Sequence, residues 1–198
     1  MSEMGADEPA LDAQNETGRV VAVRLRNACP ESMWYSVEPW GEGYDLHPGH
    51  ALTLLSDGPN SAYLEVVLEE AMVTTWSDTG TTHTVLDGET DLGPGLGWGP
   101  PVPSYPPGFG RPTLPLAPAG VYRVELLCKN KGAHPLVLRV PTQSEQYTLL
   151  PGATCAVVAA GRHGGTLELE LAENAVTVNG WPAAQIAIVG EGGWSVTS

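Results

Sequence analysis

"YDLHPGHALTLL", residues 44–55, returns 103 residues later as "YTLLPGATCAVV", residues 147–158, without a gap. The alignment extends to both sides, and its identities include Asn27/Asn130, Val37/Val140, Tyr44/Tyr147, Leu46/Leu149, Pro48/Pro151, Gly49/Gly152, Leu64/Leu167, Leu68/Leu171 and Val73/Val176. A fixed offset of this kind is the signature of an internal repeat. The sequence therefore predicts a tandem duplication, in which copy 1 and copy 2 correspond residue by residue.

Apolar residues occupy every second position in both copies, as in Val21, Val23 and Leu25. This period is typical of strands that bury one face. Further inward sets are Met33, Tyr35 and Val37 with Leu136, Leu138 and Val140, and Leu64, Val66 and Leu68 with Leu167, Leu169 and Leu171. The carboxylates between them, such as Glu65 and Glu168, are expected on a wet face. With Gly and Pro every ten or so residues, the pattern predicts an all-β fold of two tandem, small, antiparallel sandwich-like or barrel-like units.

The composition divides the chain into four segments. We expect a disordered acidic tail at residues 1–18, copy 1 at 19–88, a connector at 89–118 and copy 2 at 119–198. The density of Pro and Gly in the connector predicts an extended spacer. Its "PPVPSYPP" stretch also has the PxxP spacing that an SH3-type groove accepts, which is the alternative interpretation.

Charge is distributed very unevenly. The net charge is −14, and the twelve carboxylates between Arg26 and Arg111 have no Lys or Arg among them. Such a surface repels phosphate backbones, so nucleic acid is not expected as a partner. A cation or a basic protein partner is attracted instead. The alternative is that the acidity serves solubility alone.

Location and redox state follow from what the sequence contains. No apolar run approaches the roughly 20 residues that a membrane helix needs, and the N-terminus does not resemble a signal peptide. We therefore expect no membrane partner and a cytoplasmic location. The three cysteines suggest neither a disulfide framework nor a thiolate zinc site. Cys128 and Cys155 align with Leu25 and Leu52, which predicts two small buried hydrophobic side chains.

The "EPWG" element at residues 38–41 belongs to copy 1 alone. If Met33, Tyr35 and Val37 point inward, Trp34 and Glu38 point outward and Trp40 follows at a bend. The predicted binding residues are Trp34, Glu38, Trp40, Tyr44 and Asp45; copy 2 has Val137, Pro141 and Gln143 at the first three positions. An aromatic and acidic face suits a cationic, sugar or protein ligand. The alternative is that the tryptophans cover the sheet or pack against copy 2.

The His47-Pro48-Gly49-His50 stretch has the composition of a type II turn. Copy 2 keeps the Pro-Gly pair but has Leu150 and Ala153 in place of the histidines. Two imidazoles at the ends of a turn can share Zn²⁺ or Ni²⁺, with Glu38, Asp45 or His83 completing the shell. The alternative is that His47 and His50 are ordinary exposed residues and no cofactor is bound.

Asn27, the "VEPWGEGYDLHPG" stretch and, in copy 2, "AVTVNGWPAAQIAIVGEG" resemble small uncharacterised bacterial β domains. The resemblance covers roughly 70 residues in each copy, and copy 2 retains only the Tyr-x-Leu-x-Pro-Gly turn and the Gly-Trp-Pro element. It implies the fold and transfers no catalytic residue. The leading hypothesis is a non-enzymatic binding protein that uses the acidic, Trp-bearing face of copy 1. The alternative is a metal-dependent or carbohydrate-directed enzyme centred on His47 and His50.

Overall fold

The computed structural model describes residues 19–58, 63–77, 82–93, 121–162, 164–190 and 193–194. The expected tail at residues 1–18 and most of the expected connector, with its PxxP stretch, lie outside the described residues. The regular secondary structure of the described part consists of strands, apart from one 3-10 turn at Pro141–Gln143. The predicted all-β class is confirmed. These ranges contain no helix long and apolar enough to cross a membrane.

Sixteen strands alternate with short turns. The first half contains β1 (Arg19–Asn27), β2 (Met33–Glu38), β3 (Glu42–Leu46), β4 (Ala51–Gly58), β5 (Tyr63–Leu68), β6 (Met72–Trp76), β7 (Thr82–Asp87) and β8 (Thr90–Asp91). The second half contains β9 (Tyr122–Asn130), β10 (Leu136–Val140), β11 (Glu145–Leu149), β12 (Thr154–Gly161), β13 (Thr166–Ala172), β14 (Ala175–Asn179), β15 (Gln185–Gly190) and β16 (Gly193–Trp194). Each strand of the second half begins 103 residues after its counterpart in the first.

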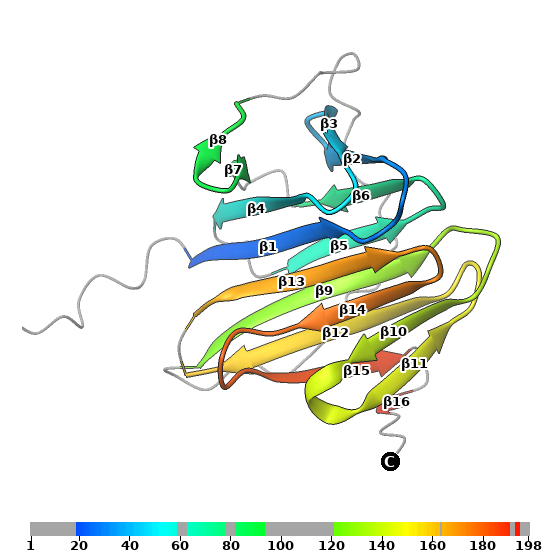
Figure 1. The fold of residues 1–198 in the computed structure, drawn as a ribbon. Helices are drawn as coiled ribbons and strands as arrows, with labels where there is room; N and C mark the ends of the chain where they lie inside the picture. Colours follow the sequence, from blue (N-terminus) through cyan, green and yellow to red (C-terminus); the bar gives the residue numbers. More distant parts are fainter. Residues whose placement is uncertain are drawn as a thin grey trace, which may run out of the picture.

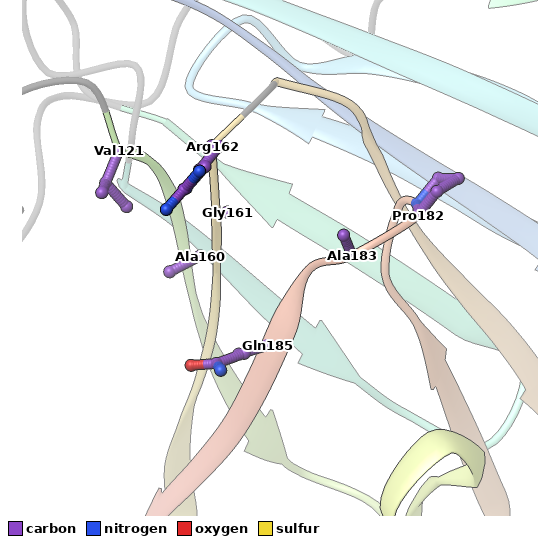
Figure 2. Close-up of a pocket in the computed structure, with 7 residues that line it drawn as sticks. All are labelled: Val121, Ala160, Gly161, Arg162, Pro182, Ala183 and Gln185. Carbon is purple, nitrogen blue, oxygen red and sulfur yellow. The ribbon is translucent and has the colours of Figure 1, made fainter.

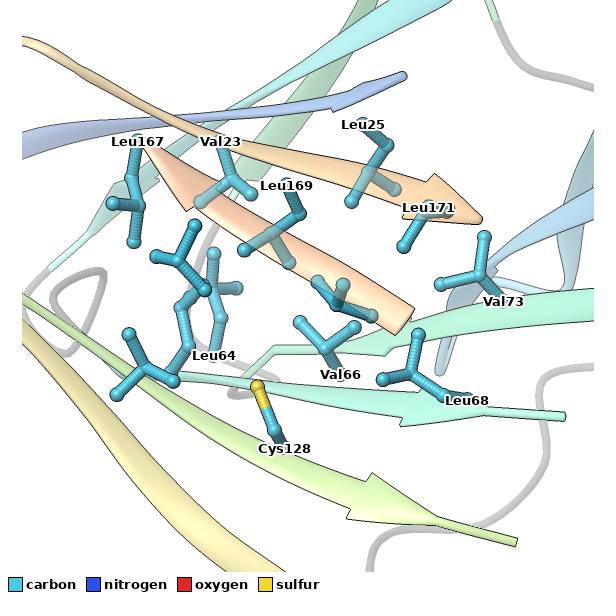
Figure 3. Packing of buried hydrophobic residues seen from close by; sticks show 14 of the residues in the cluster. Val23, Leu25, Leu64, Val66, Leu68, Val73, Cys128, Leu167, Leu169 and Leu171 are labelled. Carbon is cyan, nitrogen blue, oxygen red and sulfur yellow. The ribbon is translucent and has the colours of Figure 1, made fainter. Parts of the chain in front are cut away.

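The strands form two sheets that pack face to face (Figure 1). Sheet A has the order β11-β10-β14-β13-β1-β4-β7-β8, and sheet B has the order β16-β15-β12-β9-β5-β6-β2-β3. Aliphatic side chains of both sheets meet in one cluster, where Leu25 and Leu169 of sheet A face Val66 and Cys128 of sheet B (Figure 3). Removal of this apolar surface from water is the main stabilisation of the sandwich.

Both sheets run without a break from one half to the other. Strand β1 pairs in parallel with β13, which places Leu25 beside Leu169, and β5 pairs in parallel with β9, which places Val66 beside Cys128. The pairs β2–β6 and β10–β14 are parallel as well. The sequence pattern predicts antiparallel units, whereas these four pairs are parallel. The alternation of apolar and polar residues does not distinguish parallel from antiparallel pairing, because side chains alternate with period two in both kinds of strand.

The predicted inward residues form the core. Val21, Val23 and Leu25 are at most 4 % exposed, and their counterparts in the second half are buried too. Glu65 departs from the expectation of a wet face, because it is only 4 % exposed. Its cross-strand neighbours Trp76 and Leu127 are large enough to cover it on the outer face of sheet B.

The Pro-Gly turns have the geometry that the sequence predicts. Gly49 has φ +76° and Gly152 has φ +78°, values that glycine adopts without a steric penalty. His50 N donates to His47 O at 3.0 Å, and Ala153 N donates to Leu150 O at the same distance. The turn therefore forms with or without histidines.

The first residues assigned to the connector belong to a hairpin instead. Thr90 and Asp91 form β8, which pairs with Asp87 and Leu86 of β7 across a turn at Gly88. Gly88 has φ +61°, which suits a tight hairpin turn. The Pro-Gly composition begins at Gly88, so the predicted end of copy 1 at residue 88 falls within this hairpin.

Candidate functional site

The predicted binding residues lie at the β3–β8 end of the sandwich, but they do not share one face. Trp34 and Asp45 are Cα partners on β2 and β3 and point outward from sheet B. Tyr44 points inward and is buried, beside Tyr35 with ring centroids 6.0 Å apart. Trp40 lies in the bend between the two strands. The five residues therefore divide between an outer face and an inner cluster.

Trp34 forms a flat apolar surface on the outer face. Its indole ring lies directly on the backbone of Gly43, so that a side chain at position 43 would collide with the ring. An aromatic ring that covers a glycine on a neighbouring strand supports the pairing of the two strands. The ring is half-buried, and the carboxylate of Asp45 beside it is exposed. This pairing leaves both side chains available to a ligand.

Glu38 is half-buried on the same outer face. Its Oε1 accepts a hydrogen bond from Ser36 Oγ at 3.3 Å, while its Oε2 is buried without a partner among the described residues. Trp76 is its Cα partner on β6. Glu38 therefore contributes a carboxylate that is partly shielded from solvent, and Asp45 contributes the freely accessible one.

The inner cluster connects the edges of the two sheets. His83 of β7, in sheet A, places its Nε2 3.0 Å from Glu42 Oε2 of β3, in sheet B. Tyr44 OH lies 2.9 Å from the same Glu42 oxygen and 3.0 Å from the carbonyl oxygen of Gly93, so its proton is shared between two acceptors. The ring of Trp40 lies on that of His83, with centroids 4.1 Å apart. These contacts close the sandwich at this end.

Two buried polar atoms in this cluster have no hydrogen-bond partner among the described residues. They are His83 Nδ1 and Ser56 Oγ, and the two residues are direct Cα partners on β7 and β4. Copy 2 has Ile186 and Ala159 at the equivalent positions, and both are buried. The same backbone thus accepts aliphatic side chains, so the fold does not require these polar groups. Sequence reasoning named His83 only as a metal ligand and missed its pairing with Glu42, which no local pattern indicates.

His47 and His50 lie together on the exposed turn after β3. Their ring centroids are 5.8 Å apart, and His47 Nδ1 lies 3.1 Å from Ser32 Oγ. Across the described ranges, no three His, Cys, Asp or Glu side chains are grouped to hold a metal ion. His83 is instead engaged with Glu42. The described residues therefore offer two imidazoles and no third protein ligand for the predicted metal site.

Cys128 and Cys155 are buried, as predicted, and are Cα partners on β9 and β12. A hydrogen bond that the Cys128 thiol donates to Cys155, together with burial, raises the pKa of Cys128 well above its ordinary value. Burial raises the pKa of the half-buried Cys29 thiol, and the carboxylates of Glu173 and Glu31 add to the effect. The reactive thiolate is disfavoured in both cases, so neither Cys29 nor Cys128 has the properties of a catalytic nucleophile.

Three surface hollows among the described residues lie away from the predicted binding residues. One of about 430 Å³ lies where β12 ends and β15 begins, and Arg162 and Gln185 are its only long polar side chains (Figure 2). A second, of about 700 Å³, lies on the outer face of sheet A. A third, of about 580 Å³, lies between the loop after β1 and the β13–β14 turn and carries three glutamates, Glu31, Glu70 and Glu173.

No protein-family model, no curated protein and no solved structure matches this chain. The resemblance to small bacterial β domains stays a prediction. The roles of individual residues are therefore inferred from their contacts, burial and charge.

Proposed function

We propose that the chain is a non-enzymatic binding protein that holds an extended, positively charged segment of a partner protein. The segment binds at the acidic edge, which we define as β3 with the β7–β8 hairpin and their carboxylates Glu42, Asp45, Asp87, Glu89 and Asp91. The observation that supports this most directly is the direct pairing of Trp34 with Asp45 on the last two strands of sheet B. An aromatic surface beside a carboxylate suits the aliphatic stem and charged head of Lys or Arg.

Strand β3 offers the backbone for such an interaction. It is the last strand of sheet B in the described part of the chain, and β2 is its only neighbour there. An end strand presents N–H and C=O groups to which an extended peptide can add as a further strand. On an added strand, the side chains of the outward face repeat about every 6.8 Å. A basic residue at one of these outward positions therefore lies beside Asp45.

Charge favours a basic partner over an acidic one. Asp45, Asp87, Glu89 and Asp91 are exposed, and no Lys or Arg lies between Arg26 and Arg111 to neutralise them. Opposite charge accelerates encounter and excludes like-charged competitors. Phosphate backbones are disfavoured for the same reason, so nucleic acid is not proposed.

The site is proposed for copy 1 only. We infer that the chain arose by duplication of one unit and that the first copy later acquired the binding residues. Copy 2 has Val137 and Thr148 where copy 1 has Trp34 and Asp45. It has Gln143 and Ile186 in place of Trp40 and His83. The three free cysteines favour the reducing cytoplasm as the proposed location.

The test uses a fluorescent peptide of alternating Lys and Val, with a Glu-Val peptide of equal length as the comparison. We expect the Lys peptide alone to bind the full chain, with an affinity that falls as salt rises. Asp45→Asn and Trp34→Ala should each weaken binding about tenfold, the loss of about 1.4 kcal/mol. Val137→Ala, at the position equivalent to Trp34, is the matched control and should leave binding unchanged. Equal binding of both peptides, or full binding by Asp45→Asn, would refute the proposal.

A further inference from the structure

The hollow of about 700 Å³ on the outer face of sheet A lies where the two halves of the chain meet. Its lining includes Thr53, Arg24, Glu168 and Asn179. We propose that this groove binds a neutral polyhydroxylated ligand, a chain of sugar units. The site is separate from the acidic edge and does not depend on the function proposed for it.

The four lining residues form one row across four adjacent strands. Thr53 of β4 is the Cα partner of Arg24 of β1, Arg24 is the partner of Glu168 of β13, and Glu168 is the partner of Asn179 of β14. All four point outward, because Val23, Leu25, Leu167 and Leu169 beside them fill the core. Neighbouring strands lie about 4.8 Å apart, so the row extends over roughly 14 Å. This length accommodates several hydroxyl-bearing rings in succession.

The chemistry of the row suits hydroxyl groups. Guanidinium, carboxylate and amide groups are planar and each presents two adjacent hydrogen-bonding atoms, while the Thr53 hydroxyl both donates and accepts. Adjacent hydroxyls of a sugar ring match such two-point groups, because each hydroxyl also donates and accepts. The row therefore combines donors and acceptors in the way a polyol requires.

Charge within the groove is balanced. Arg24 Nε lies 3.5 Å from Glu168 Oε2, and Arg26 Nε lies 3.8 Å from Glu168 Oε1. Both carboxylate oxygens therefore face an arginine, but Arg24 Nε makes no hydrogen bond at this distance among the described residues. Arg24 and Glu168 are the charged side chains that line the groove, and each lies beside a side chain of opposite charge. A neutral ligand is favoured, because it leaves the ion pair intact.

Trp181 forms a rigid wall at one end of the groove. Its ring lies against the backbones of Gly161 and Gly165, and the side chain is only 7 % exposed. A side chain at either glycine would collide with the ring, so the glycines are what allow Trp181 to fill this place. The wall limits how far a ligand extends along the row.

The equivalent positions on sheet B show that the fold does not need three of the four residues in the polar row. Arg24, Thr53 and Asn179 correspond to Leu127, Ala156 and Trp76 at an offset of 103 residues. Leu127 and Ala156 are buried on the outer face of sheet B. Three of the four polar residues of sheet A therefore occupy places that hold apolar residues in sheet B, whereas the fourth, Glu168, corresponds to the buried Glu65. The hollow in Figure 2 has no comparable row, since only Arg162 and Gln185 offer long polar groups there.

The experiment titrates the ¹⁵N-labelled full chain with four neutral tetrasaccharides: cellotetraose, maltotetraose, xylotetraose and N-acetylchitotetraose. We expect at least one of them to give saturable shifts of the backbone amides of Arg24, Glu168 and Asn179. Asn179→Ala and Thr53→Ala should each weaken that binding about tenfold. Neither side chain holds a charged neighbour in place, so both variants are expected to fold. Arg139→Ala, on the same sheet face but outside the groove, is the control and should bind as the wild type does.

Three results would overturn the proposal. The first is that none of the four tetrasaccharides shifts the groove amides. The second is that binding survives both Asn179→Ala and Thr53→Ala. The third is that anionic tetragalacturonate binds the groove more tightly than every neutral tetrasaccharide and loses that affinity between about 50 and 500 mM salt, because Arg24 would then recognise charge.

Discussion

Asn27 and Asn130 form the same three side-chain hydrogen bonds, 103 residues apart. The amide nitrogen of Asn27 donates to Glu31 O and Leu46 O, both at 2.8 Å, and its Oδ1 accepts from Cys29 N at 2.8 Å. Asn130 donates to His134 O and Leu149 O, both at 2.9 Å, and accepts from Gly132 N at 2.9 Å. Each asparagine therefore links the loop after its own strand, β1 or β9, to the strand before the Pro-Gly turn, β3 or β11.

Asn27→Ala should lower the free energy of unfolding by about 2–4 kcal/mol. The side chain is fully buried, and its removal leaves two carbonyls and one N–H without their partner, at about 1–3 kcal/mol for each group that stays buried. Asn130→Ala should have an effect of similar size. Urea unfolding measures both, with the exposed Asn174→Ala as the control. A loss below about 0.5 kcal/mol for Asn27→Ala, the range of ordinary surface changes, would contradict the structural role.

Ser56→Ala should leave the fold as stable as the wild type or raise its stability by up to about 1 kcal/mol. Ser56 Oγ is buried without a partner among the described residues, so its removal ends a desolvation cost. Alanine is also the residue at the equivalent position 159. Thermal unfolding measures the change. A clear loss of stability would mean that the hydroxyl has a partner in solution.

Tyr35→Phe should make the fold less sensitive to alkaline pH. Burial raises the pKa of Tyr35 above its ordinary value of 10, and the hydrogen bond with Thr75 opposes the rise only in part. The unfolded chain therefore releases the tyrosine proton first, so this contribution to stability is complete below about pH 10 and declines as the pH rises above that value. Urea unfolding from pH 8 to pH 11 should show a steeper decline for the wild type than for Tyr35→Phe. Equal slopes would contradict the prediction.

Thiol labelling of the native chain should proceed in two stages. Cys29 is half-buried and should react first, at a rate that rises with pH because its pKa is raised. Cys128 and Cys155 are at most 2 % exposed and should react only as the fold opens. Cys29→Ser should remove the early stage and leave the later one. Rapid reaction of Cys128 in the native protein would show that its inward position is wrong.

The sequence predicts the strands well because its signals for them are local. Alternation places Val23, Leu25 and Leu167 in the core, and Pro48-Gly49 places a turn, since each depends on a few neighbouring residues. The joining of the two halves depends on pairs such as Leu25 with Leu169. An apolar side chain packs equally well in an edge strand and in a central one, so the sequence does not predict this pairing.

The sequence likewise predicts only part of the candidate site. Trp34 and Asp45 were both predicted as binding residues, and the antiparallel β2–β3 hairpin places them opposite one another. The pairing of His83 with Glu42 joins β7 to β3, two strands in different sheets and 41 residues apart. Spacing along the chain carries no signal for such a contact, so Tyr44 is predicted as a binding residue although its side chain belongs to the inner cluster.

Trp40→Ala should destabilise the fold, although the sequence predicts Trp40 and Trp34 as equivalent binding residues. The ring of Trp40 lies on His83 and packs against the core, so its removal opens a space beside the Glu42–His83 pair. Because Trp40 is only partly buried, we expect a loss of about 2–3 kcal/mol, below the 3–5 kcal/mol of a fully buried tryptophan. Trp34 lies on Gly43 at the surface, so Trp34→Ala should cost about 1 kcal/mol and act chiefly on peptide binding. Urea unfolding with the exposed Leu150→Ala as the control separates the two, and a larger loss for Trp34→Ala than for Trp40→Ala would reverse their roles.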